Sequence, residues 1–129
     1  MRDPGLALQT ALYQRLTAAL NPVRVYDSVP PDTPYPYVTL DYEISSNASP
    51  LSGKKRENRL FYLSVWSNYE GQDEVKRINA QISEALSEVK LLLSTGNVVS
   101  VRVLRTSTSR EPDGKTFMGS VTLRIITQS

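Results

Sequence analysis

The sequence predicts an α+β fold in which a mostly antiparallel sheet of four to five strands has two helices packed on one face. Two segments repeat apolar residues at intervals of three and four, as amphipathic helices do, and the other apolar runs read as strands. The predicted order is helix, short strand, long strand, strand, helix, strand, strand. Runs of strands joined through one crossover helix favour a largely antiparallel sheet with both helices on the same face.

Length and charge limit the possible functions. The chain has 129 residues, 40% of them hydrophobic and 22% charged, which is typical of a folded protein, and we expect one domain over 1–129. Its net charge of +2 is too small to indicate nucleic acid as the main partner. We therefore expect proteins as partners.

The chain contains neither cysteine nor histidine. This absence excludes disulfides, thiolate chemistry, zinc sites built from those residues and catalytic triads with a histidine base. We expect no enzyme activity, no catalytic residue, no metal site and no cofactor. No run approaches the ~20 apolar residues that span a bilayer, and the first 25 residues lack a signal-peptide pattern. We expect a soluble protein made in a cytoplasm, without a membrane partner.

The first helix is expected to begin at Asp3 as N-cap, with Pro4 in the first turn, and to run to about Leu20 before Asn21-Pro22 ends it. One apolar stripe follows the helix: Leu8, Leu12, Leu16 and Leu20. A short strand over 23–26 comes next.

Four prolines lie between this strand and the next: Pro30, Pro31, Pro34 and Pro36. Each fixes its own φ and restricts the residue before it, so the segment is predicted to be stiff and extended. It is either a rigid surface arm or a connector that keeps two strands apart.

The long strand over 37–45 alternates, with Val38, Leu40, Tyr42 and Ile44 on one face and Thr39, Asp41 and Glu43 on the other. Asp41 and Glu43 are two residues apart and are therefore expected to share a face. They suggest a small carboxylate-dependent hydrolase, but a solvated strand face explains them better, since exposed acids have no reason for raised pKa values.

The segment 46–56 contains turn formers and then a basic cluster, which predicts a long mobile loop. The strand over 59–67 is apolar on both faces and is expected to be central. Its aromatic residues Phe61, Tyr62 and Trp66 could stack bases, as in RNA-binding sheets. The glycine-rich signature of those folds is missing, so core packing is the favoured role.

The second helix is predicted over 75–89, with Asp73 and Glu74 stabilising its N-terminal end. The strand over 98–106 is expected to point Val99, Val101 and Val103 one way. A turn at 110–114 then leads into the last strand, over 116–127. Its inward residues are predicted to be Phe117, Gly119, Val121, Leu123 and Ile125.

Three local patterns, with the order and spacing of the elements, resemble a known family. They are Val25-Tyr26-Asp27 to Pro36-Tyr37-Val38, the block from Leu63 through Trp66 to Gly71 with the amphipathic helix behind it, and Arg110 to Gly114 before the closing strand. Together they span nearly the whole chain. The chain resembles the tail completion, or tail terminator, proteins of long-tailed phages and gene transfer agents.

The resemblance implies a hexameric ring at the head-proximal end of the tail tube, which stops tube polymerisation and provides a docking face for the head connector. The implied partners are further copies of the chain, the tail tube protein and the head connector or stopper protein. DNA would pass through the ring without sequence-specific binding. The implied location is the virion tail, with assembly in the host cytoplasm, and no catalytic residue is implied.

Two groups of residues are candidates for contacts between subunits or with partners. The basic group is Lys54, Lys55, Arg56 and Arg59, which could meet an acidic neighbour or DNA, or could belong to a solvated loop without a specific role. The tyrosine group is Tyr35, Tyr37 and Tyr69, because tyrosine supplies rigid amphipathic area at interfaces. The alternative function is a nucleic-acid-binding α+β module that uses the aromatic strand and the basic loop.

Overall fold

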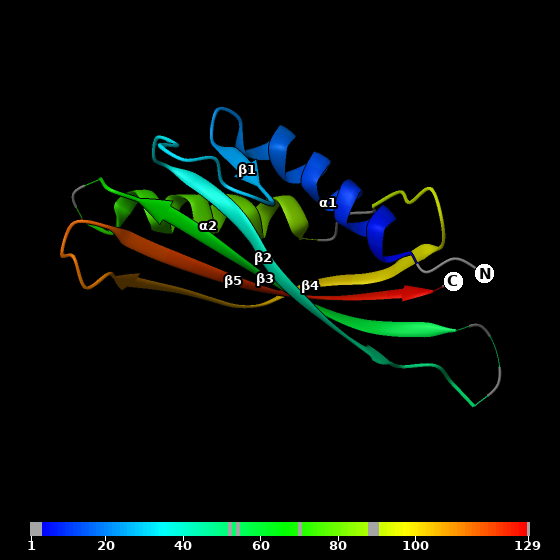
Figure 1. Ribbon diagram of the computed structural model, residues 1–129. Helices are drawn as coiled ribbons and strands as arrows, with labels where there is room; N and C mark the ends of the chain where they lie inside the picture. Colours follow the sequence, from blue (N-terminus) through cyan, green and yellow to red (C-terminus); the bar gives the residue numbers. More distant parts are fainter. Residues whose placement is uncertain (1–3, 52, 54, 70, 88–90, 129) are drawn as a thin grey trace.

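The computed structural model describes residues 4–51, 53, 55–69, 71–87 and 91–128. Its elements occur in the predicted order (Figure 1). They are α1 (Gly5–Leu20), β1 (Arg24–Tyr26), β2 (Tyr37–Asn47), β3 (Arg56–Ser67), α2 (Asp73–Leu86), β4 (Asn97–Arg110) and β5 (Phe117–Gln128).

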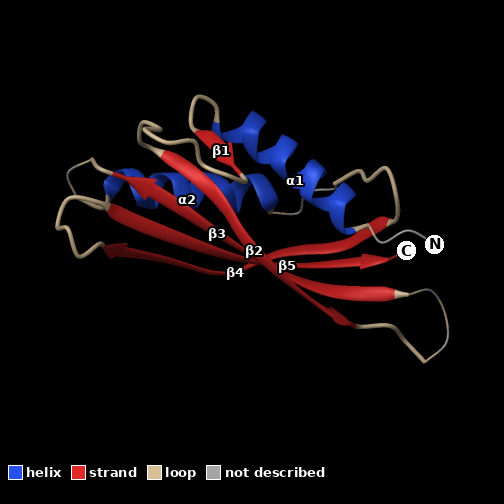
Figure 2. Ribbon diagram, viewed as in Figure 1, coloured by secondary structure: helices blue, strands red, loops and turns tan. Residues whose placement is uncertain are grey.

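The strands form one sheet in the order β1-β2-β3-β5-β4. Only the pairing of β1 with β2 is parallel, and the other neighbours are antiparallel. Both helices lie on the same side of the sheet (Figure 2). The α+β prediction is therefore confirmed. We call the side of the sheet that carries Tyr62 and Trp66 the open face, because neither helix covers it.

The apolar stripe of α1 is confirmed, because all four of its leucines are 1% exposed or less. The helix begins one residue later than expected. Pro4 occupies the N-cap position and its carbonyl accepts the Leu8 amide at 2.8 Å, while Asp3 lies outside the described residues. Fully burying a leucine contributes about 1.5–3 kcal/mol, so this stripe attaches α1 to the sheet.

Helix α2 has Asp73 and Glu74 in its first turn, as predicted. It ends at Leu86, earlier than predicted, because Ser87 is already extended, and the predicted last residue, Val89, lies outside the described residues. The helix packs closely on β5, where a Cβ atom at Gly119 would lie 2.5 Å from Cγ1 of Val75. Glycine at this position therefore allows the helix to approach the sheet.

Strands β3 and β5 supply the centre of the core. The predicted inward row of β5 is confirmed, and it pairs with the buried Phe61, Leu63 and Val65 of β3. These residues share the core with the leucines of α1 and with Val75, Ile78 and Ile82 of α2.

The predicted face of β2 is wrong beyond Leu40. The register shifts between Leu40 and Tyr42, so that Asp41 is an extra residue in the strand and the residues after it change sides. Tyr42, expected to be inward, is 58% exposed and pairs with Tyr62 on the open face. The same reversal places Ile44 opposite Leu60 on that face.

The prediction that Val99, Val101 and Val103 share one face of β4 is also partly wrong. Register shifts occur between Val98 and Ser100 and between Val103 and Arg105. Val98, Val101 and Val103 pack against the core, whereas Val99 is exposed. The two bulges therefore replace simple alternation along this edge strand.

The loop predicted over 46–56 is shorter than expected. Strand β2 continues to Asn47 and β3 begins at Arg56, so the connection is 48–55. The amide of Ala48 donates to the carbonyl of Arg56 at 3.0 Å, which extends the pairing past the strands. Figure 1 shows this β2–β3 hairpin ending well away from the helices.

Candidate functional site

The two candidate groups lie at opposite ends of the molecule. The segment 27–36, which we call the proline arm, lies with β1 and the N-terminal end of α2 at one end, and the β2–β3 hairpin forms the other (Figure 1). The tyrosine candidates belong to the first end and the basic candidates to the second. The structure therefore brings together the described members of each group and separates the groups.

Tyr35 and Tyr37 stack in the tyrosine group, with ring centroids 5.3 Å apart, and Tyr26 meets the ring of Tyr37 edge-on at 6.0 Å. Burial raises the pKa of the Tyr37 hydroxyl, and the neighbouring Tyr35 raises it further. Tyr35 and Tyr69 are both exposed. The aromatic cluster therefore combines a fixed centre with accessible rings, as residues at protein interfaces do.

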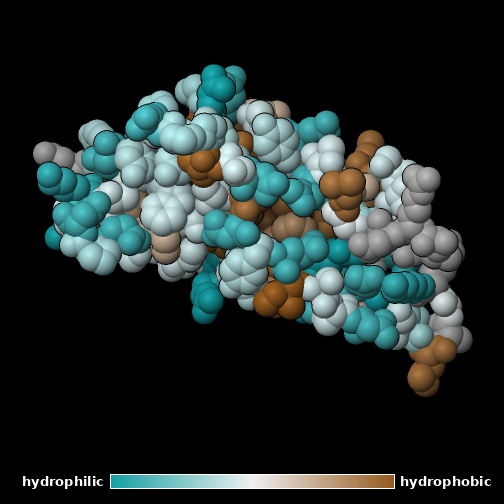
Figure 3. Space-filling model, in the orientation of Figure 1, coloured by the Kyte–Doolittle hydropathy of each residue, from teal (hydrophilic) through white to brown (hydrophobic). Residues whose placement is uncertain are grey.

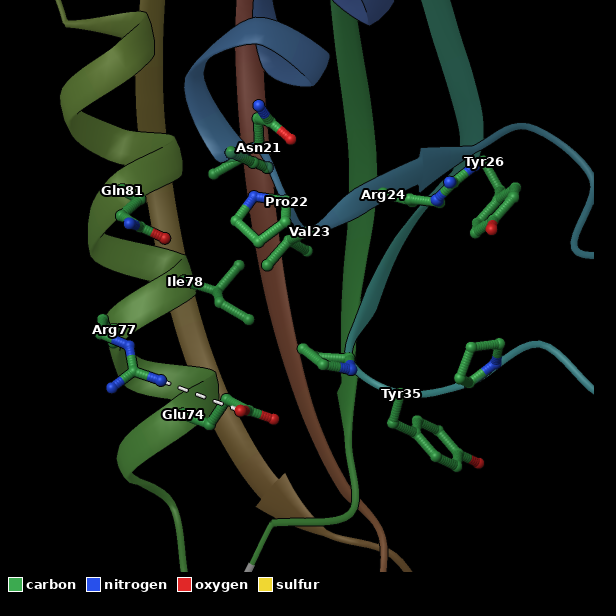
Figure 4. A pocket seen from close by; sticks show the side chains of 13 residues that line it. Asn21, Pro22, Val23, Arg24, Tyr26, Tyr35, Glu74, Arg77, Ile78 and Gln81 are labelled. Atoms are coloured by element: carbon green, nitrogen blue, oxygen red, sulfur yellow. Dashed lines mark ion pairs between the residues drawn. The ribbon is translucent and has the colours of Figure 1, made fainter.

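A groove of about 690 Å³ lies between α2 and the segment formed by the end of α1, β1 and the proline arm. Figure 4 shows Ile78 and Val23 between the two walls, with Tyr26 and Tyr35 on the side opposite the helix. The apolar lining includes Leu20, Pro22, Val23, Pro34, Pro36 and Ile78. Glu74 and Arg77 form an ion pair of 3.8 Å on the helix side. The groove is thus apolar inside, with Glu74 and Arg77 on the helix wall and Arg24 on the opposite wall.

A second hollow of about 490 Å³ shares Tyr35, Pro36 and Glu74 with this groove. Its other described lining residues are Asn68, Tyr69 and Asp73, so the charged groups in the lining are two carboxylates. The Ser67 hydroxyl donates to Glu74 at 2.6 Å and accepts the Tyr69 amide at 3.1 Å. These bonds connect the β3–α2 turn to the groove.

At the other end, Lys55 is exposed and pairs with Glu57 at 3.3 Å. Arg56 donates from Nε to Gln128 at 2.8 Å. Lys54 lies outside the described residues. Among the basic candidates, Lys55 and Arg56 are the described members with accessible side chains.

Arg59 is placed differently from the expectation, because only 1% of the residue is exposed. Its guanidinium lies 3.1 Å from Glu57 and 3.4 Å from Glu43, and its Nε donates to the Thr127 hydroxyl at 3.0 Å. Arg59 lies on the buried row of β3, two residues from Phe61. Because side chains alternate between the faces of a strand, the sequence spacing from Phe61 could have indicated this inward position. Arg59 therefore holds the base of the hairpin instead of forming an exposed contact.

The carboxylate pair suggested for a hydrolase is not formed. The bulge places Asp41 with Thr39 and Ser64, whose hydroxyls both donate to its carboxylate, that of Thr39 at 2.7 Å. Glu43 lies on the opposite side of the sheet, against Arg59. The same-face prediction is therefore wrong. In the described part of the chain, no group of three or more acidic residues could hold a metal ion.

The aromatic strand is divided between the two faces of the sheet. Phe61 is buried in the core and cannot stack a base, while Trp66 donates from Nε1 to Thr39 at 3.2 Å on the open face. Three arginines lie on that face, Arg102, Arg105 and Arg124, of which sequence reasoning missed Arg105 and gave the other two no role. Arg102 and Arg124 are direct cross-strand partners. The outward position of Arg105 depends on the register shift between Val103 and Arg105 in β4.

Neither described helix is long and apolar enough to cross a membrane.

The family described as Tail completion protein gp17 matches residues 7–128. A solved structure entitled "Virion of native gene transfer agent (GTA) particle" contains a chain that is similar to this one, with a TM-score of 0.86 and 28% sequence identity over 100% of both chains. The search of curated proteins gave no match. The family match covers nearly all seven elements described above. The chain therefore belongs to the Tail completion protein gp17 family.

Proposed function

We propose that the protein is a structural virion component that forms a closed homo-oligomeric ring, a hexamer, at the head-proximal end of the tail tube. The ring ends tube polymerisation and gives the head connector or stopper protein a face to dock on, while DNA passes through its centre. The observation that carries the proposal is the family match over residues 7–128. The similarity to a chain of a gene transfer agent particle, over the whole length of both, supports the virion location.

The shape of the subunit is compatible with ring formation. A closed ring is built by head-to-tail contacts, in which each subunit uses two different surfaces. This subunit has two unlike ends, one with a groove and exposed tyrosines and one with a basic hairpin. Repeated head-to-tail contact requires two different surfaces at opposite ends of the subunit, and the groove and the hairpin meet this requirement.

Ending a tube needs geometry and no chemical step. A ring can bind the last tube ring through one face, while its other face lacks the surface on which a further tube ring would assemble. Asp41 and Glu43, the acids considered for catalysis, lie on opposite faces of the sheet and form no pair. Shape therefore accounts for the proposed activity.

Deleting the gene from the phage or gene transfer agent that encodes it tests this function. We expect headless tails of uncontrolled length in electron micrographs, and normal particles once the gene is supplied in trans. Normal, infectious particles from the deletion strain would overturn the proposal.

A second function, nucleic-acid binding, is favoured by the arginines of the open face. Within the described residues, Arg102 and Arg105 form no ion pair with a carboxylate. Arg102 lies directly opposite Arg124, and two like charges in such a pair are unfavourable without an anionic partner. DNA binding by the isolated protein would then weaken with salt, and the log-log slope would flatten when Arg102, Arg105 and Arg124 are neutralised. No measurable binding near physiological salt would exclude this function.

A further inference from the structure

The tip of the β2–β3 hairpin presents a leucine to solvent. Leu51 is fully exposed, with a relative accessibility of 111%. Figure 3 shows hydrophobic surface at the far end of the molecule, where this hairpin ends. A single exposed leucine is common in proteins. Its place at the end of a hairpin that projects from the sheet suggests contact with another surface.

Hydrogen bonds hold the described residues that lead into and out of the hairpin tip. The Ser49 amide donates to the Asn47 side chain at 2.9 Å, and the Ser49 hydroxyl accepts the Arg56 amide at 3.0 Å. The buried ion pairs of Arg59 fix its base. Fixing the strands below the tip before binding reduces the entropy that association costs.

The groove at the opposite end is complementary to this tip in two ways. Its apolar lining, with Leu20, Val23 and Ile78, can receive a leucine side chain. The adjoining hollow supplies Asp73 and Glu74, whose charge is opposite to that of Lys55 and Arg56 at the hairpin. The arginines of this end, Arg24 and Arg77, line the main groove, and Arg77 pairs with Glu74, so Asp73 is the carboxylate assigned to Lys55. Apolar contact supplies affinity, and complementary charges set the orientation of the partners.

We propose that the β2–β3 hairpin of one subunit docks in the groove of the next subunit, with Leu51 on the apolar lining and Lys55 facing Asp73. The occupant of the groove is a second copy of this chain. The inference rests on the proposed ring, because a hairpin and a groove at opposite ends of every copy form a repeating head-to-tail contact.

Cross-linking tests the contact directly, since the chain contains no cysteine and every introduced thiol is unique. Gln81 is exposed and lines the groove. The double variant Leu51→Cys with Gln81→Cys, supplied in trans to the deletion strain, is treated in purified particles with a short bis-maleimide. We expect a ladder of linked chains on a denaturing gel, extending to the copy number of the ring. Each single variant is expected to give no ladder.

The matched control combines Leu51→Cys with Thr10→Cys, because Thr10 lies in a different hollow, beside α1. This pair should give at most a tenth of the linked product. Equal linking by both pairs, or no linking by the Gln81 pair in particles that hold the ring, would overturn the inference and leave the proposed function standing. Linking of Leu51→Cys to a different protein would assign the hairpin to another partner. Particles that lack the chain would instead contradict the proposed function.

A charge exchange provides an independent check. Lys55→Glu should reduce the number of particles with joined heads at least tenfold, and adding Asp73→Lys should restore most of them. Circular dichroism of the purified variants verifies that each is folded. A double variant as defective as Lys55→Glu alone would contradict the assigned pairing.

Discussion

The rings of Tyr42 and Tyr62 stack on the open face of the sheet, with centroids 4.4 Å apart and planes 14° from parallel. They are cross-strand partners only because the bulge at Asp41 turns Tyr42 away from the core. The bulge in turn is held by the hydroxyls of Thr39 and Ser64 on the Asp41 carboxylate. One acidic residue thereby determines which aromatic residues the open face displays.

We expect this stack to stabilise the fold measurably. In a double-mutant cycle with Tyr42→Ala and Tyr62→Ala, urea unfolding should give a coupling free energy of about 0.5–1.5 kcal/mol. The aliphatic pair Ile44 and Leu60, on the same face, is the control and should couple by less than about 1 kcal/mol. Independent effects of the two tyrosine substitutions would show that the stack does not hold in solution.

Gly119→Ala should destabilise the protein by about 1–3 kcal/mol in chemical denaturation, because the new methyl group overlaps Val75 and Asn79. Shortening the opposing side chain makes room for it. The double variant Gly119→Ala with Val75→Ala should therefore be more stable than the sum of the two single effects predicts. If the two changes in the free energy of unfolding simply add, the new methyl group does not press on Val75, which would contradict the close packing of α2 on β5.

Arg59→Met should lower the free energy of unfolding by about 3 kcal/mol, because it leaves Glu43 and Glu57 without the cation between them. Arg77→Met is the control, since that side chain is 66% exposed in a 3.8 Å pair, and it should cost less than about 1 kcal/mol. Thermal and urea unfolding of both variants measure the difference. Equal costs would contradict a buried structural role for Arg59.

Asp113 provides a pH-dependent contribution at the β4–β5 turn. Its carboxylate accepts the Thr116 hydroxyl at 2.7 Å, and one oxygen also accepts the amides of Thr116 and Lys115, each at 2.8 Å. These bonds, that of the Thr116 hydroxyl foremost, lower the pKa of Asp113 in the folded protein. Its contribution to stability is therefore fully present above the pKa of the unfolded chain and is lost as pH falls through the folded value.

The stability of Asp113→Asn, compared with that of the natural chain across the acid range, tests this assignment. The difference between the two proteins should be constant above pH 5 and shrink as the pH falls below the ordinary range of aspartate. Carboxyl chemical shifts from nuclear magnetic resonance would give the pKa itself. A pKa of Asp113 at or above the ordinary aspartate value would show that the hydrogen bonds of the turn do not lower it.

The elements with uninterrupted periodicity could be predicted from the sequence. The leucines of α1 and the inward row of β5 follow one spacing from end to end, and every member is buried. In each case, a local pattern is enough because no residue changes the phase of the element.

The bulges could not be predicted, because they depend on distant partners. The position of Asp41 is decided partly by Ser64, 23 residues away in the sequence. The burial of Arg59 was missed although alternation from Phe61 indicated an inward position. Its charge favours the surface unless Glu43, Glu57 and Thr127 converge on it, and only the assembled sheet brings those groups together.

The groove likewise has no local signature. Its lining comes from the end of α1, β1, the proline arm and α2, so that Val23 and Ile78 meet although 55 residues separate them. The tyrosine candidates could be chosen for their chemistry, but their gathering at one end depends on the topology. For the proposed contact of the hairpin, the sequence offered one signal, a leucine at position 51 among the turn-forming residues of its loop.

Electron cryomicroscopy of purified particles is the most direct test of the central claim, that this chain closes into a ring between head and tail. A reconstruction at the head-proximal end of the tail should contain one ring of this chain with sixfold symmetry, its sheet and two helices fitting the density. Particles without the chain at that position, or with a single unassembled copy there, would contradict the account.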